Sequence, residues 1–217
     1  RLRKYDGVTE ERLPDGLKAE LRPYQQRGYD WLAFLRDFGF HGILADDMGL
    51  GKTLQALTWL LAEHKPQKDE TGEVKPARAE NPSLVVCPTS VASNWVAEAA
   101  KFTPGLKVVK LTGANRDKVY DQLKNADIVI TTYAIMRLDL ARLQRRTFHA
   151  LILDEAQNIK NPESQTAIAA KKVKSKHRFA LTGTPLENSL LELWSVFDFL
   201  MPDFLDQKSM FKSRYVR

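Results

Sequence analysis

The sequence predicts an α/β fold in which a central, mostly parallel sheet carries helices on both faces. Short, wholly apolar runs alternate along the chain with longer stretches whose apolar residues recur at helical spacing. One apolar run leads into a glycine-rich turn, 46–53, that ends in Lys-Thr. Another run ends in two adjacent carboxylates, Asp154 and Glu155. A phosphate-binding turn and paired carboxylates are what a nucleoside triphosphate with Mg²⁺ requires.

The predicted elements follow one another in a regular alternation. Pro23 suits the first turn of a helix that ends before Gly39, because the N–H that proline lacks would have no partner there. Wholly apolar runs fit strands that are buried on both faces. The predicted strands are 43–45, 84–87, 107–111, 128–130, 151–153 and 179–181. After the first helix, the predicted helices are 53–64, 91–102, 115–124, 134–145, 163–173 and 190–200.

Two segments have the composition of connecting chain. Residues 1–20 are charged, contain Pro14 and Gly16, and show no clean period, which predicts a linker or tail of a longer protein. Residues 65–82 are polar with alternating charges and several prolines, which predicts a mobile surface loop. The globular part is therefore expected from residue 21 to about residue 202, with the loop 65–82 on its surface.

Composition narrows the class of protein. The 217 residues and 43% hydrophobic content suffice for one sizeable core. No run approaches the roughly 20 apolar residues of a membrane span, and the first residues lack the apolar region of a secretory signal. The single cysteine, Cys87, excludes an internal disulfide and fits a reducing cytosol. A net charge of +6 permits a nucleic-acid partner without requiring one.

The glycine-rich turn is the predicted ATP-binding site. Gly49 and Gly51 let backbone N–H groups point at phosphate oxygens, and the next helix offers its positive end. Lys52 can reach the β- and γ-phosphates, and the Thr53 hydroxyl can ligate Mg²⁺. Asp46 occupies a position that usually holds glycine, and a helix start with an exposed lysine is the plain alternative. The predicted ATP-binding residues of the turn are Asp47, Met48, Gly49, Leu50, Gly51, Lys52 and Thr53.

The two carboxylates are predicted to be catalytic, together with Lys52. Asp154 would hold Mg²⁺ directly or through water, and Glu155 would orient and deprotonate the attacking water. The alternative is an acidic helix start, which is common. That alternative does not explain why an apolar strand ends in adjacent acids about 100 residues after a phosphate loop.

Seven short motifs occur in a fixed order along the chain. They are LRPYQ at 21–25, DDMGLGKT at 46–53, CPTS at 87–90, NW at 94–95, ITTY at 130–133, DEAQ at 154–157 and LTGTP at 181–185. Their order and spacing resemble the Swi/Snf-type ATPases of helicase superfamily two, over about residues 21–217.

This resemblance implies a RecA-like P-loop NTPase lobe over residues 21–202, the first of two lobes in a motor that tracks along double-stranded DNA and remodels protein–DNA complexes. ATP and Mg²⁺ are the implied cofactors, and Gln25 would read the adenine edge. Residues 203–217 would begin an insertion that leads to a second lobe absent from this chain. Because that lobe supplies phosphate-neutralising arginines in the family, these residues alone are expected to bind ATP weakly and hydrolyse it slowly or not at all.

The same resemblance assigns two further groups. The coupling group would link nucleotide state to lobe movement, and Gln157 in it stands where the family commonly has histidine. The DNA-facing group would bind phosphates without reading sequence. The coupling group is Gln157, Thr182, Gly183 and Thr184, and the DNA-facing group is Thr89, Ser90, Thr131, Thr132, Lys160 and Asn161.

Taken without the resemblance, several of these residues fit plainer roles. Thr131 and Thr132 fit a strand end, because β-branched residues favour strands. Ser90 fits an N-cap for the next helix. Trp95 fits core packing, because duplex DNA offers no free base faces on which an indole could stack.

Other functions are also compatible with these motifs. A strand-separating helicase or a restriction-type DNA motor is one alternative, and a non-catalytic DNA- or protein-docking module with a relic ATP site is another. Intact Lys52 and Glu155 argue against the relic. No motif specifies a protein partner. A DNA motor would act in the cytoplasm at the nucleoid of a bacterium, or in the nucleus of a eukaryote.

Overall fold

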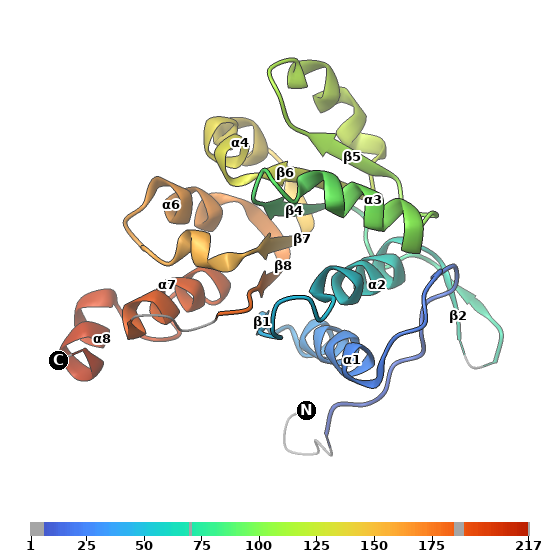
Figure 1. The fold of residues 1–217 in the computed structure, drawn as a ribbon, viewed down its shortest axis with the longest axis horizontal. Coiled ribbons are helices and arrows are strands. Elements are labelled where there is room, and N and C mark those ends of the chain that lie inside the picture. Colours follow the sequence, from blue (N-terminus) through green and yellow to red (C-terminus); the bar gives the residue numbers. More distant parts are fainter. Residues whose placement is uncertain (1–6, 70, 185–188, 217) are drawn as a thin grey trace.

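The computed structural model describes residues 7–69, 71–184 and 189–216 (Figure 1). A six-stranded sheet lies at its centre with the strand order β1-β8-β7-β4-β6-β5, and every neighbouring pair is parallel. The predicted α/β class with a parallel sheet is confirmed. The strands are β1 (Gly42–Leu44), β4 (Ser83–Cys87), β5 (Val108–Leu111), β6 (Ile128–Thr132), β7 (Thr147–Asp154) and β8 (Lys174–Leu181).

Helices cover both faces of this sheet (Figure 1). One face packs against α1 (Pro23–Phe38), α2 (Lys52–His64) and α3 (Ala92–Phe102). The other face packs against α4 (Tyr133–Leu138), α6 (Gln165–Lys172) and α7 (Leu190–Leu200). The remaining helical segments are η2 (Arg116–Asn125), α5 (Leu140–Leu143), η3 (Ala156–Ile159) and α8 (Lys208–Tyr215).

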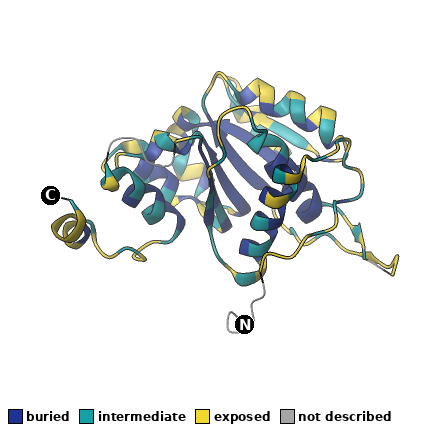
Figure 2. Cartoon of the chain, turned by 60° about the horizontal axis from the view of Figure 1, so that its bottom comes forward, coloured by how far each residue is buried: buried dark blue, intermediate teal, exposed yellow. Residues whose placement is uncertain are grey.

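The two faces carry separate apolar cores because side chains alternate along each strand. On β7, Ile152 belongs to the core under α1–α3, whereas Leu151 and Leu153 belong to the core under α6 and α7. Figure 2 shows the central strands as the buried part of the molecule. The alternation also decides the direction of Asp154, which lies on the same side of β7 as Ile152 and therefore faces α2 and α3.

Four predicted elements differ most from the observed ones. The helix predicted over 134–145 is divided at Asp139, whose carboxylate accepts hydrogen bonds from Arg116 and from Tyr120. The segment predicted as a helix over 115–124 is a 3₁₀ helix. Strands β7 and β8 begin earlier than predicted, because their polar first residues pair with each other, Thr147 opposite Lys174.

The N-terminal segment differs from the expected linker. Leu13 and Leu17 pack against the core under α1–α3, and the Lys18 amide donates to the carbonyl of Phe102. Residues 7–20 therefore form part of the lobe surface, and the rest of the predicted linker, 1–6, lies outside the described residues.

The predicted loop 65–82 contains a small antiparallel sheet of β2 (Gln67–Lys68) and β3 (Val74–Lys75). This hairpin is tied to the N-terminal segment, because the Asp15 amide donates to Gln67 Oε1 at 2.7 Å and Arg12 donates to the Lys68 carbonyl. Most of the segment therefore has a defined backbone path along the lobe.

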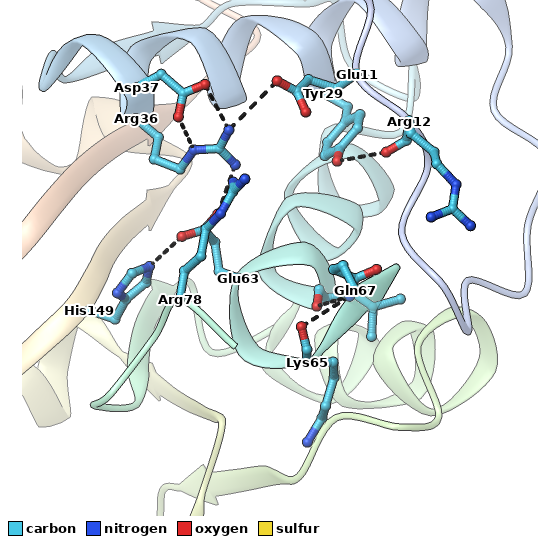
Figure 3. Close-up of polar contacts among 11 residues, drawn as sticks. Glu11, Arg12, Tyr29, Arg36, Asp37, Glu63, Lys65, Gln67, Arg78 and His149 are labelled. Atoms are coloured by element: carbon cyan, nitrogen blue, oxygen red, sulfur yellow. Dashed lines mark hydrogen bonds and ion pairs between the residues drawn. The ribbon is translucent and has the colours of Figure 1, made fainter. Parts of the chain in front are cut away.

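A group of ionisable side chains lies where the strands of the sheet begin (Figure 3). We call it the Glu63 cluster; its buried members are Glu63, Arg36 and His149, and its exposed member is Arg78. Glu63 accepts from Arg36 at 2.9 Å and from His149 at 2.9 Å. Burial would raise the pKa of Glu63, but the hydrogen bond from His149 and the charge of Arg36 outweigh burial and lower it to about 2. This cluster joins α1, α2 and β7.

Candidate functional site: the carboxyl rim of the sheet

All of the predicted functional turns emerge at one rim of the molecule. Because the strands run parallel, their carboxyl ends lie at the same edge of the sheet, where ligands bind in open α/β folds. The turns after β1, β4, β7 and β8 carry the phosphate loop, Thr89, Glu155 and Thr182, respectively, and β6 ends at Thr132. The prediction that these turns share one rim is confirmed.

The phosphate loop has the backbone that its glycines permit. Gly49 and Gly51 have φ angles of +82° and +80°, a region that disfavours other residues. A Cβ added to Gly51 would lie 2.6 Å from Gln25 Nε2, so the end of the Gln25 side chain would have to move away from the loop. Helix α2 starts at Lys52 with no side-chain cap on its N-terminus. Its first backbone N–H groups are therefore available to an anion.

Two predicted ATP-binding side chains make contacts within the loop itself. Lys52 Nζ donates to the carbonyl oxygens of Asp46 at 2.7 Å and Asp47 at 3.0 Å. Gln25 Nε2 donates to the Leu50 carbonyl at 3.1 Å. Both side chains therefore have partners within the protein, and Gln25 joins α1 to the loop.

Asp46, the residue at the usual glycine position, has its own partner. Gln55 Nε2, from the fully buried face of α2, donates to Asp46 Oδ2 at 2.9 Å. The carboxylate is thereby tied to the phosphate-loop helix. The hydrogen bond from Gln55 explains how the loop accommodates an aspartate at position 46, where glycine is usual.

Asp154 ends β7 as a nearly buried carboxylate, 9% exposed. Its Oδ2 accepts a hydrogen bond from Trp95 Nε1 at 2.8 Å, and its Oδ1 accepts one from the Glu155 amide at 3.1 Å. The Tyr133 hydroxyl holds the backbone by donating to the Asp154 carbonyl at 2.8 Å. Burial raises the pKa of Asp154, while the Trp95 hydrogen bond opposes that rise.

Glu155 turns the chain out of the sheet with a left-handed backbone, φ +52°, which is uncommon for a residue with a side chain. Gln157 Nε2 donates to Glu155 Oε2 at 2.8 Å. Thr182 Oγ1 donates to Gln157 Oε1 at 3.1 Å, and the Thr184 amide donates to Thr182 Oγ1 at 3.0 Å. A continuous line of hydrogen bonds therefore runs from Glu155 to the end of β8.

The phosphate loop and the carboxylates lie close together. Only β8 separates β1 from β7, so the two strand ends are about 10 Å apart. Burial raises the pKa of Asp154, and the charge of Lys52 is near enough to oppose that rise slightly. At the end of β8, a Cβ added to Gly183 would lie 2.9 Å from Met48 Cγ, so this turn touches the phosphate loop. The residues present fit a triphosphate with its Mg²⁺.

Two of the predicted DNA-facing residues are turned inward. Thr131 is fully buried, and its hydroxyl donates to the Leu111 carbonyl at 2.8 Å. Thr132 is the N-cap of α4, where its hydroxyl accepts from the Ile135 amide. Their side chains contribute to the fold, as the strand-end alternative predicted. In this conformation, the structure does not offer the Thr131 hydroxyl to a phosphate.

The other predicted DNA-facing residues lie nearer the solvent. Thr89 and Ser90 are exposed beyond β4, and the N-cap of α3 is Val91, so the N-cap expected of Ser90 is wrong. Asn161 is exposed and accepts from the Glu163 amide. Lys160 is partly exposed, with Nζ 3.7 Å from Glu192. Pro185 of the LTGTP motif lies outside the described residues.

Sequence reasoning missed the role of Trp95 at this site. The residue is buried, as core packing predicted, yet its indole N–H binds the predicted metal-ligating carboxylate. The NW pair at 94–95 was a signal in the sequence, but nothing in it indicated a partner 59 residues away. Tyr133 was likewise visible only as part of the ITTY motif.

The described part of the chain lacks two features that would change this interpretation. No group of three or more His, Cys, Asp or Glu residues there is arranged to hold a metal ion. A site in which Mg²⁺ takes one or two protein ligands and phosphate oxygens needs no such group. Within the same residues, no helix has the length and apolar character needed to cross a membrane.

Comparison with known proteins places this chain in a family. The SNF2-related domain matches residues 24–217, which is most of the chain. The chain therefore belongs to the SNF2-related family.

The relatives show what kinds of protein carry this lobe. One is the TATA-binding protein-associated factor mot1 of Aspergillus fumigatus, 45% identical over 97% of this chain and 11% of its own length. Another is MG018 of Mycoplasma genitalium, named as an uncharacterized ATP-dependent helicase, 42% identical over 90% of this chain and 18% of its own. The chain thus spans less than a fifth of the length of these two relatives.

A solved structure confirms the RecA-like class of the fold. The Sulfolobus solfataricus SWI2/SNF2 ATPase core in complex with double-stranded DNA matches with a TM-score of 0.80 and 41% identity. The match covers 96% of this chain and 41% of that chain.

Proposed function

We propose that this lobe is the first ATPase lobe of an ATP-dependent double-stranded-DNA translocase that remodels protein–DNA complexes. The observation that carries the proposal is the meeting of the phosphate loop, Asp154 and Glu155 at one rim, with Gln157 and Thr182 joining them. Family membership supports an ATPase, and a related core whose solved structure contains double-stranded DNA supports a DNA-bound motor.

In this proposal the phosphate loop binds and orients the triphosphate. The backbone N–H groups at the start of α2 donate to phosphate oxygens, and Gly49 and Gly51 allow their close approach. Lys52 exchanges the carbonyls of Asp46 and Asp47 for phosphate oxygens. Thr53 and Asp154 would hold Mg²⁺, which when bound neutralises charge on the phosphate oxygens.

Glu155 is the proposed general base. Its carboxylate lies directly after the predicted metal-ligating residue and is oriented by the amide of Gln157. It would accept the proton of the attacking water, so that the nucleophile forms in place. Gln157 and Thr182 then connect this carboxylate to the turn after β8, through which the state of the nucleotide would reach a second lobe.

DNA binding is assigned to the exposed part of the rim. Thr89, Ser90, Asn161 and Lys160 offer hydroxyl, amide and ammonium groups that suit phosphates. Such contacts tolerate any sequence, and the contact made by the lysine weakens with salt. The protein would accordingly act on chromosomal DNA, in the nucleoid or the nucleus.

The test is ATP hydrolysis by the full-length protein with duplex DNA, single-stranded DNA or RNA. We expect duplex DNA to stimulate hydrolysis most. Glu155→Gln should lower turnover by about 10²–10⁴-fold, the contribution typical of a general base, and leave ATP binding intact. Lys52→Ala should abolish ATP binding. Glu163→Gln, in an exposed ion pair with Lys208, is the control that should change neither.

Different results would favour the alternatives. Strand displacement in the same assay would indicate a separating helicase. ATP binding without any hydrolysis, with or without DNA, would indicate a docking module with a relic site. Hydrolysis by the isolated lobe at the full-length rate would contradict the proposed need for a second lobe. The arginines of that lobe would be expected to raise the hydrolysis rate by about 10³–10⁵-fold.

A further inference from the structure

Trp95 makes a contact that core packing alone does not require. Its side chain is only 1% exposed, and its indole N–H lies 2.8 Å from Asp154 Oδ2. The residue belongs to the first turn of α3, where its amide donates to the Val91 carbonyl. The indole is therefore anchored by helix α3, while the carboxylate that it contacts belongs to strand β7.

A second tryptophan shows that this bond is not an automatic result of burial. Trp59 on α2 is fully buried and packs its ring edge-on against Phe179. Its indole N–H has no hydrogen-bond partner among the described residues. This lobe thus tolerates an unpaired indole N–H in one core position and directs another at Asp154.

The two donors to Asp154 together fix the carboxylate plane. Oδ2 is held from α3 by Trp95, and Oδ1 is held from the backbone by the Glu155 amide. With a donor on each oxygen, the carboxyl group resists rotation about its Cβ–Cγ bond. Tyr133 fixes the same residue from the other face of the sheet by binding its carbonyl.

We propose that Trp95 is a positioning residue that orients the Asp154 carboxylate toward a nucleotide-bound divalent cation. This inference rests on the proposed function, because it assumes that Asp154 is the metal-ligating carboxylate of the ATP site. A residue that orients a metal ligand typically contributes 10–100-fold in metal affinity. Trp95 acts through Asp154 and does not itself touch the nucleotide.

The test measures metal binding directly. Mn²⁺ replaces Mg²⁺ as a paramagnetic probe, and its affinity for the full-length protein with a non-hydrolysable ATP analogue is followed by electron paramagnetic resonance. Trp95→Phe keeps an aromatic ring and removes the N–H. We expect it to weaken Mn²⁺ binding about 10-fold or more, and to leave metal-free binding of the analogue unchanged.

Trp59→Phe is the matched control. It makes the same substitution at an equally buried tryptophan whose N–H has no partner, so Mn²⁺ affinity should not change. In an Asp154→Asn background, Trp95→Phe should add no further loss, because residues that act through one group are not additive. An additive loss would instead mean that Trp95 acts by another route.

Two outcomes would overturn the inference while the proposed function stands. One is unchanged Mn²⁺ affinity in a folded Trp95→Phe protein, and the other is an equal loss in Trp59→Phe. If Trp95→Phe does not fold, benzothienylalanine at position 95 replaces the N–H by sulfur at nearly constant shape, and the same loss is expected. Failure of the unsubstituted protein to bind Mn²⁺ with the analogue would refute the proposed function itself.

Discussion

Two buried carboxylates lie near opposite ends of strand β7, and their hydrogen-bond partners differ in charge. Glu63 lies beside His149 near the start of β7, and Asp154 ends that strand, about 17 Å further along. Glu63, 1% exposed, is bound by the cation Arg36 and by His149. Asp154 is bound by two neutral donors, the indole of Trp95 and the amide of Glu155.

The difference shows that the hydrogen-bonding and charged partners of a buried acid decide the direction of its pKa shift. Burial disfavours the charged form of both carboxylates. At Glu63 the partners outweigh burial and lower the pKa to about 2, whereas at Asp154 burial prevails and the pKa is raised. The Glu63 cluster is thus complete within the protein. The carboxyl rim lacks a full counter-charge at Asp154, which is the condition that a bound cation relieves.

The largest expected change in stability comes from removing the charge of Glu63. Glu63→Gln removes the buried partner of Arg36, which keeps the half-exposed Asp37, so we expect a cost at the lower end of the about 3–5 kcal/mol typical of a broken buried pair. We expect the free energy of unfolding, measured by urea titration at pH 7, to fall by this amount. The exposed pair of Glu163 and Lys208 provides a control, since Glu163→Gln should change stability by less than about 0.5 kcal/mol.

The same variant has a defined pH signature. Because the folded pKa of Glu63 is depressed to about 2 from 4.5, its charge contributes stability above pH 4.5. That contribution is lost as the pH falls toward 2. The difference between Glu63→Gln and the unsubstituted protein should shrink over this window. A difference that is constant with pH would show that packing, and not charge, holds the cluster together.

Much of the carboxyl rim was predictable from the sequence because its signals are local. The glycines of the phosphate loop, the apolar strand before Asp154 and the alternation of helix and strand each lie within a few consecutive residues. A parallel sheet then places every strand end at one edge without further information. Gly51, for example, was predicted and found in the turn that needs a positive φ.

The Glu63 cluster and the Trp95 contact were not predictable in this way, because each joins residues far apart in the chain. Glu63 and His149 are 86 residues apart, and Trp95 and Asp154 are 59 apart. A charged residue in a helix pattern is usually solvated, so Glu63 gave no local sign of burial. The break of the helix at Asp139 has the same origin, since its partner Arg116 is 23 residues away.

A smaller effect of opposite sign tests the other half of the comparison. Asp154→Asn removes a buried charge that lacks a full counter-charge, so we expect the unliganded protein to gain about 1 kcal/mol at pH 7, the scale of single stabilising substitutions. The raised pKa means that Asp154 contributes stability below its unfolded value near 3.8, lost as the pH rises through the folded value. The gain should therefore vanish below pH 3.8. A loss of stability at pH 7 would mean that Asp154 is fully compensated within the protein.

The smallest predicted effect separates structural hydroxyls of the rim from exposed ones. Thr131→Val removes the buried hydrogen bond to the Leu111 carbonyl, and we expect a loss of about 1 kcal/mol of stability with no change in DNA affinity. Thr89→Ala, at an exposed position, should leave stability unchanged and weaken duplex binding several-fold, on the order of one hydrogen bond.

Binding of a labelled duplex by the full-length protein at several salt concentrations distinguishes these two roles. Because a hydroxyl releases no counterion, the slope of affinity against salt should be the same in both variants and in the unsubstituted protein. Weaker DNA binding by a folded Thr131→Val protein would mean that this residue turns outward when DNA binds. The hydrogen bond from Thr131 to Leu111 would then exist only in the DNA-free conformation.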